Sequence, residues 1–141
     1  TKIAPAELRP FIDNASRPSE MKFEGLRRQL SVSRLKEIHQ FRLLAKRLRY
    51  QGEVQKALLG ATRLDVNKLE LVQDIVGQSC DEWQLRRRFR KYLKTTKSNH
   101  RAESQAIQDK LTEDVGRSLR RALKKIAQIA WTGNPAIHPK L

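Results

Sequence analysis

The sequence has one cysteine and few aromatic residues. The single cysteine, Cys80, excludes an internal disulfide and is typical of a protein in a reducing intracellular compartment, the cytoplasm or an organelle matrix. Phe, Trp and Tyr together supply 6% of the 141 residues, which is too little for a platform of stacked bases. This composition favours slender helices that share a modest core over a β-sandwich or barrel.

Long apolar runs are also missing. No window of about 18 apolar residues occurs, so we expect no membrane-spanning helix. Residues 1–5 lack the apolar run of a signal peptide, whereas a transit peptide that had already been removed would leave no trace. A membrane is therefore not an expected partner.

Residues suited to metal binding or catalysis are few and scattered. His39, His100 and His138 lie far apart, and none has a second His, Cys or acid at metal-ligand spacing. Cys80 has no neighbouring histidine to activate it, and the six glycines stand singly instead of forming a phosphate-binding loop. We therefore expect no catalytic residue, no metal and no cofactor.

Positive charge is what the sequence has in excess. Thirty Lys and Arg residues oppose fifteen Asp and Glu residues, which gives a formal net charge of +15. Self-repulsion of this charge opposes compaction, and a polyanionic partner would offset it. Arginine outnumbers lysine, and its planar guanidinium holds phosphate through paired hydrogen bonds. The charge therefore predicts a nucleic-acid partner.

Apolar residues recur at helical spacing, and no segment alternates as a strand would. We expect an all-α fold, a small bundle of about four to six helices with a long C-terminal amphipathic helix and irregular arms at both ends. Residues 1–18, with three prolines, form the predicted N-terminal arm, and residues 19–94 form the bundle. Ser19 is the expected N-cap of a helix that ends near Gln29. Its predicted buried side consists of Met21, Phe23, Leu26 and Leu30.

The next helix is predicted over residues 34–50. Gly52 is an expected stop or bend, after which a short segment over residues 53–59 ends at Gly60. The apolar stripe of this helix recurs every three or four residues, as one helix face requires. It consists of Leu35, Ile38, Phe41, Ala45 and Leu48.

Two further helices are predicted before residue 95. Asp65 caps the first, which closes at Gly77. Ser79 and Glu82 fit a capping box, so a separate helix is expected over residues 81–94. The first helix presents Val66, Leu69, Val72 and Val76 to the core, and the second presents Trp83, Leu85, Phe89, Tyr92 and Leu93.

The remaining chain divides into three segments. Residues 95–99 break the apolar pattern and predict a linker or hinge. Residues 100–131 predict one long amphipathic helix that either packs on the bundle or projects from it, and residues 132–141 predict an irregular tail. The apolar stripe of the long helix consists of Ile107, Leu111, Val115, Leu119, Leu123, Ile126 and Ala130.

Lysine and arginine gather on one side of three predicted helices. Residues 86–94 hold six cations and no acid, and residues 115–131 also lack acids. Like charges at i,i+4 destabilise a helix by roughly 0.2–0.5 kcal/mol per pair, so we expect an anionic partner rather than a merely solvated face. The candidate nucleic-acid-binding residues are Arg86, Arg87, Arg88, Arg90, Lys91 and Lys94, then Arg117, Arg120, Arg121, Lys124 and Lys125, and finally Arg42, Lys46 and Arg49.

Three aromatic residues are candidates for stacking on bases. Trp83 and Tyr92 are expected to be core anchors instead, whereas Trp131 lies next to the irregular tail. Because aromatic residues are so few, contacts with the nucleic-acid backbone should dominate over base reading.

We expect a non-catalytic basic protein that binds a phosphate backbone, RNA in preference to DNA, as a subunit or accessory factor of a ribonucleoprotein such as the ribosome. Basic charge spread over several faces and proline-containing ends favour RNA, and other proteins of the assembly are expected partners. One alternative is a DNA-binding regulatory or architectural protein whose helix from Ser79 carries residues 86–94 into a groove. Another is a structural subunit or membrane-surface protein that uses the amphipathic helix over residues 100–131.

Overall fold

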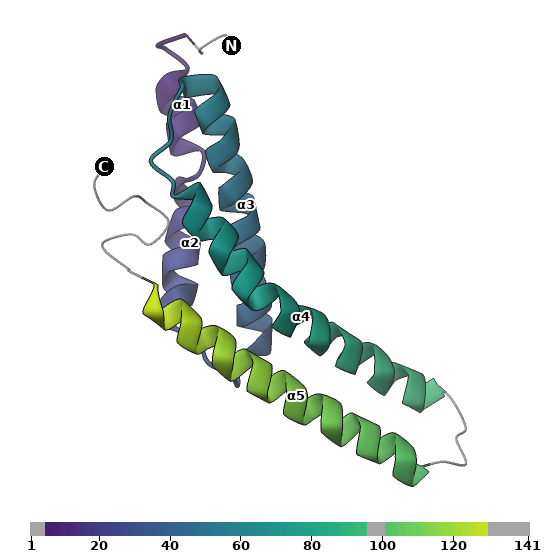
Figure 1. Ribbon diagram of the computed structural model, residues 1–141. Helices are drawn as coiled ribbons and strands as arrows, with labels where there is room; N and C mark the ends of the chain where they lie inside the picture. The colour runs from purple at the N-terminus through teal and green to yellow at the C-terminus, as the bar shows by residue number, and fades with distance from the viewer. Residues whose placement is uncertain (1–4, 96–100, 130–141) are drawn as a thin grey trace.

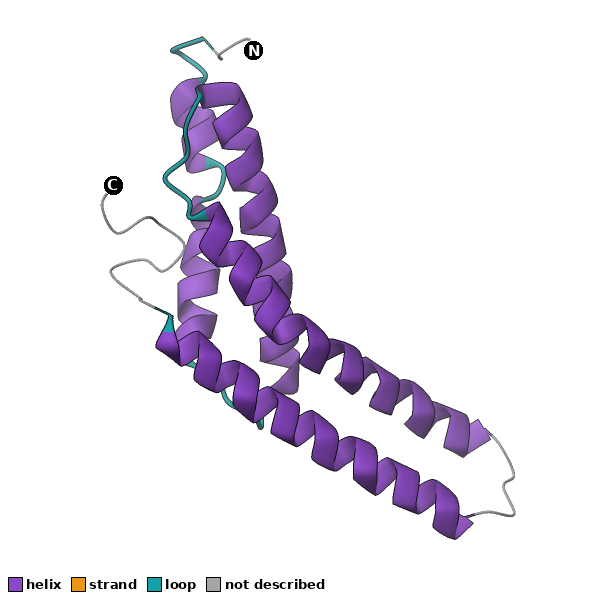
Figure 2. Ribbon diagram, in the orientation of Figure 1, coloured by secondary structure: helices purple, strands orange, loops and turns teal. Residues whose placement is uncertain are grey.

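The computed structural model describes residues 5–95 and 101–129. These residues form five α-helices and no strand, so the expected all-α bundle is confirmed (Figure 2). In chain order the helices are α1 (Arg9–Asn14), α2 (Arg17–Arg28), α3 (Leu35–Leu59), α4 (Val66–Thr95) and α5 (Arg101–Gln128) (Figure 1).

Three helices, α1, α2 and α4, pack on α3, and α5 packs on α4. The α1 and α2 helices lie along α3, α4 crosses α3, and α5 returns antiparallel beside α4 (Figure 1). The ends of α4 and α5 that are joined to each other extend well beyond α3 as a two-helix arm (Figure 1). The centre of the core is formed by Phe23, Ile38, Phe41, Leu48, Leu64, Leu69, Val72, Val76, Val115, Leu119 and Ile126.

The N-terminal segment is more helical than predicted. Residues 9–14, expected to be irregular, form α1, and α2 begins at Arg17. The expected N-cap at Ser19 is wrong, because α2 begins two residues earlier, at Arg17. Pro18 lies in the first turn of α2, where the N–H that proline lacks would have no partner within the helix. Ser19 is therefore buried inside the helix. Phe23 is buried as predicted, but Met21 is 76% exposed and does not belong to the core.

The expected stop at Gly52 is also wrong, since α3 continues to Leu59. Gly52 instead permits close approach of the chain that leads into α4. A Cβ added at this position would lie 2.8 Å from Cγ2 of Val66 and 3.3 Å from Cβ of Leu64. Gly60 does end α3 as predicted, with a φ of 83° that favours glycine.

The two helices predicted over residues 65–94 are one helix. Asp65 caps its start as predicted, because Oδ1 accepts a hydrogen bond of 3.0 Å from the backbone N–H of Lys68. Gly77 does not end the helix, and Ser79 is not an N-cap. The Ser79 hydroxyl instead shares a hydrogen bond of 2.7 Å with the hydroxyl of Ser118 on α5. The separate helix from Ser79 that favoured the DNA-binding alternative is therefore part of one continuous helix, α4.

The long C-terminal helix is confirmed as α5, which packs on α4 along its length. Val115, Leu119 and Ile126 are buried as expected, whereas Ile107 is 50% exposed. The apolar stripe of α5 therefore forms part of the core. The predicted linker beyond Thr95, the predicted helical residues 130 and 131, and the predicted tail lie outside the described residues.

A buried polar cluster attaches α1 and α2 to the rest of the bundle. The Arg63 guanidinium donates to the Glu20 carboxylate at 2.5 and 2.8 Å and to Asp13 Oδ1 at 3.1 Å. Gln55 of α3 donates to the Ser16 hydroxyl at 3.0 Å. These bonds fix the N-terminal helices against α3 and the loop that follows it.

Candidate nucleic-acid interface

One stripe of side chains runs along α4 and changes from apolar to cationic where α4 leaves α3. The spacing of three or four residues continues past Trp83 and brings Arg87, Arg90 and Lys94 to the same side of the helix. These cations lie on the part of α4 that extends beyond α3 (Figure 1). The buried apolar part of the stripe consists of Leu69, Val72, Val76, Cys80 and Trp83.

Trp83 marks the transition between the two parts. Its ring is 9% exposed, so it is a core anchor as expected. The guanidinium of Arg87 lies 5.1 Å from the centre of the Trp83 ring, at cation–π distance. This contact orients the first cation of the stripe while its charge remains open to solvent.

The cations of residues 86–94 are accessible and unpaired within the described chain. We call these residues, Arg86, Arg87, Arg88, Arg90, Lys91 and Lys94, the α4 cation cluster. All are exposed except Arg86, which is half-buried. None forms an ion pair with another described residue. The cluster therefore has six positive charges available for an external anion.

Three of the acids on α5 have partners on α5 itself. Asp114 pairs with Lys110 at 3.4 Å, and Glu113 pairs with Arg117 at 2.6 Å. Asp109 accepts a hydrogen bond of 2.9 Å from Gln105. None of these three carboxylates pairs with the α4 cation cluster.

The second predicted group lies at the other end of the helix pair. The α5 cation cluster consists of Arg117, Arg120, Arg121, Lys124 and Lys125, all of them exposed. Because Ser118 faces Ser79 and the helices are antiparallel, Arg121 is level with Val76, fourteen residues before Arg90. At ~1.5 Å per residue the two cluster centres are about 20 Å apart along the helix axis.

The third predicted group is divided by the packing of α3. Arg49 is 18% exposed and lies 3.7 Å from Glu70 of α4 and 3.9 Å from Glu53. Arg42 is half-buried beside Gly77, where an added Cβ would lie 3.7 Å from Arg42 Nε. Only Lys46 of this group is exposed. The structure therefore does not bring these three cations together on one open face.

No family, curated protein or solved structure matches this chain. Among residues 5–95 and 101–129, no three His, Cys, Asp or Glu side chains are grouped to hold a metal ion. Nor does that part of the chain contain a helix long and apolar enough to cross a membrane. Burial raises the pKa of the Cys80 thiol, which disfavours the reactive thiolate.

Two apolar residues beside the α4 cation cluster were misplaced by the sequence pattern. Leu85 and Tyr92, expected to face inward, are 56% and 59% exposed. Phe89 and Leu93 are half-buried. The sequence could have predicted this exposure. If the stripe that begins at Leu69 is continued at helical spacing after Trp83, it passes through Arg87 and not through Leu85 or Tyr92. Exposed Tyr92 is therefore a residue that a base can stack on.

Proposed function

We propose that this protein binds the phosphate backbone of a nucleic acid, RNA in preference to DNA, through the α4 cation cluster. One observation carries the proposal: in the arm of α4 beyond α3, six cations with no acid among them pair with no other residue that the structure describes. In this proposal the protein performs no catalysis and acts as a subunit or accessory factor of a ribonucleoprotein, a ribosomal or ribosome-associated protein being the first example.

The spacing of the cluster creates a repulsion that phosphate would relieve. Arg86 and Arg90, Arg87 and Lys91, and Arg90 and Lys94 are like charges at i,i+4. Such pairs weaken a helix by roughly 0.2–0.5 kcal/mol each. Phosphates spaced along a strand supply the missing anions, and arginine forks bind them through paired hydrogen bonds.

RNA is favoured over DNA by the distribution of the charge. The α4 and α5 cation clusters lie at opposite ends of the helix pair, as suits a protein wedged between RNA segments. The α4 helix also begins at Val66, twenty residues before the α4 cation cluster, whereas a recognition helix contacts bases through residues near its start. Contacts should therefore be made to the backbone and should depend little on base sequence.

The test is equilibrium binding to single-stranded RNA, double-stranded RNA and double-stranded DNA over a salt series. The variant Arg87→Glu/Arg90→Glu/Lys94→Glu is compared with Lys22→Glu/Lys36→Glu/Lys56→Glu. The control makes the same charge change at exposed lysines of α2 and α3. On a single strand, each phosphate contact contributes about 0.7 to the slope of log K against log salt. If the first variant loses three contacts, its slope should be shallower than that of the wild type by about 2.

The control should retain most of the wild-type slope. Equal losses in the two variants would mean that net charge alone, and not the α4 cation cluster, drives binding. Weak binding to all three nucleic acids that neither variant changes would contradict the proposal and indicate a structural subunit instead.

A further inference from the structure

The α3 helix has a second apolar stripe opposite its core face. Leu43, Tyr50, Val54 and Leu58 follow at spacings of seven and four residues, so they share one side of the helix. Their exposed fractions are 47%, 46%, 53% and 39%. Scattered surface leucines need no explanation, but apolar residues that recur on one side of a helix, interrupted only at Lys46 and Arg47, mark an interaction surface.

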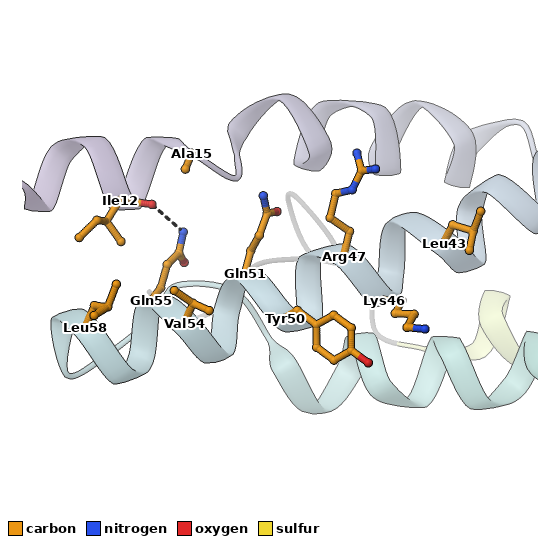
Figure 3. Close-up of a pocket in the computed structure, with 10 residues that line it drawn as sticks. All are labelled: Ile12, Ala15, Leu43, Lys46, Arg47, Tyr50, Gln51, Val54, Gln55 and Leu58. Atoms are coloured by element: carbon orange, nitrogen blue, oxygen red, sulfur yellow. Dashed lines mark hydrogen bonds between the residues drawn. The ribbon is translucent and has the colours of Figure 1, made fainter. Parts of the chain in front are cut away.

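This stripe forms the floor of a groove. The wall is α1, from which Ile12 and Ala15 face the stripe across a space of about 640 Å³ (Figure 3). Gln55 of α3 fixes this wall by donating a hydrogen bond of 3.1 Å to the Ile12 carbonyl (Figure 3). The groove is thus a built feature of the α1–α3 packing.

A second depression continues the groove along α2. Its volume is about 540 Å³, and it shares Leu43 and Arg47 with the first. The lining of the two together runs along α3 from Gln40 to Leu58. At ~1.5 Å per residue this is about 27 Å, the length of a helix of about five turns. We call the combined feature the α3 groove.

The charges on the α3 groove have one sign. Lys22, Lys46 and Arg47 line it and are exposed. No Asp or Glu is among the lining residues of either depression. An occupant that is apolar in the middle and carries carboxylates along its edge would match both properties.

We propose that the α3 groove docks an amphipathic helix of another protein, with an apolar stripe flanked by Asp or Glu. Helices dock in such grooves through apolar residues at i, i+3, i+4 and i+7. A second copy of this chain fits poorly, because each copy carries a net charge of +15 and the same basic rim. RNA also fits poorly, because Leu43, Val54 and Leu58 offer phosphate no hydrogen bond. Tyr50, the one aromatic residue of the stripe, has the Arg49 guanidinium 4.8 Å from its ring centre.

The test uses three fluorescent helical peptides of about 20 residues, the length that spans the groove. The first has a leucine stripe with glutamates on both flanks, the second has the same stripe with lysine flanks, and the third keeps the glutamates but replaces the leucines by alanine. Binding to the full chain is measured by fluorescence anisotropy. We expect saturable binding of the first peptide and affinities at least tenfold lower for the other two.

The variant Val54→Asp/Leu58→Asp should lower the affinity for the first peptide at least tenfold. Leu71→Asp/Leu85→Asp is the matched control, because these leucines of α4 are 49% and 56% exposed and do not line the groove. It should leave the affinity within twofold. Circular dichroism verifies the fold, and Lys46→Glu/Arg47→Glu tests the groove without placing acids on the apolar stripe. This last variant should weaken the glutamate peptide and strengthen the lysine peptide.

Three results would overturn the proposal. Equal binding of the alanine peptide would show that only the net charge attracts acids. Dissociation of a wild-type dimer by Val54→Asp/Leu58→Asp would assign the groove to self-association. A loss of RNA affinity in that variant as large as in Arg87→Glu/Arg90→Glu/Lys94→Glu would assign it to RNA. The first two results do not depend on whether the α4 cation cluster binds RNA, so the two proposals fail separately.

Discussion

Arg63 lies in the loop between α3 and α4, where its guanidinium reaches acids of α1 and α2. Its side chain is 16% exposed and that of Glu20 is 2% exposed, so the pair is largely removed from water. Burial lowers the pKa of Arg63, but hydrogen bonds and attraction from Glu20 and Asp13 outweigh this effect and raise it. Such a pair is costly to break, because the remaining charge is left buried without a partner.

Arg63→Ala should therefore lower the free energy of unfolding by about 3–5 kcal/mol. The double variant Glu20→Leu/Arg63→Met should recover much of this loss, because it leaves neither charge buried alone. Urea unfolding followed by circular dichroism measures both values. A loss below about 1 kcal/mol for Arg63→Ala would show that the bridge behaves as a surface pair.

Glu24 makes the stability of the fold depend on pH. Burial raises the pKa of this carboxyl, but hydrogen bonds from Arg27 and Arg28 outweigh it and hold the pKa below its usual value. A carboxyl with a lowered pKa stabilises the fold above its unfolded-state pKa, and this contribution is lost as pH falls through the folded-state value.

Glu24→Gln should thus cost about 0.2–1 kcal/mol near neutral pH, since Arg28 is largely exposed. The difference from wild type should shrink as pH falls through the folded-state pKa and vanish once both states of the wild type hold the proton. Urea unfolding at several pH values measures it. A difference that persists in acid would attribute the effect to the side-chain amide instead of the charge.

At the scale of the helices, glycine has two opposite meanings that sequence alone does not separate. Gly60 ends a helix, whereas Gly52 and Gly77 lie inside helices at buried positions. Ser79 and Glu82 also match a capping box, yet Ser79 bonds across to α5. The apolar spacing correctly predicted most core residues, because it reports burial directly. Helix ends were predicted less well, because the contact that decides them comes from another helix.

Two glycines that lie inside helices should respond in opposite ways to substitution by alanine. Gly52→Ala should destabilise the protein by about 1–3 kcal/mol, because its Cβ would lie 2.8 Å from Val66. Gly25→Ala should stabilise it by up to about 1 kcal/mol, since nothing lies within 4 Å of the added Cβ and alanine is the better helix former. Thermal unfolding of the two variants compares them. A stabilising Gly52→Ala would mean that α3 and α4 separate at little cost.

At the scale of the whole molecule, positive charge lies on both ends of the α4–α5 pair. The sequence identified the two clusters but not their separation, because neither spacing nor composition tells whether the long helix folds back. Once α5 is antiparallel to α4, clusters at the C-terminal ends of both helices must lie apart. The candidate site is therefore two patches, and the predicted third patch on α3 is divided by ion pairs with α4 and within α3.

Two patches about 20 Å apart should contribute independently to RNA affinity, because distant sites add in free energy. Charge reversal of Arg120, Lys124 and Lys125 should lower log K by an amount that adds to the loss from Arg87→Glu/Arg90→Glu/Lys94→Glu. On a long RNA, the loss of binding free energy in the combined variant should equal the sum of the two separate losses within about 0.5 kcal/mol. A combined variant no weaker than either parent would mean that RNA uses one patch only.

The arm formed beyond α3 has a consequence for local opening of the protein. Figure 1 shows α5 beside this end of α4 and no other helix, and the two helices bury few apolar side chains there. Amide hydrogens in the arm should therefore exchange with solvent through openings of lower free energy than those near Leu48 or Val72. A ligand that binds only the closed arm raises that opening energy by ~2.7 kcal/mol at a hundred times its Kd. Slowed exchange confined to the arm would then report where the anion sits, without any label on the protein.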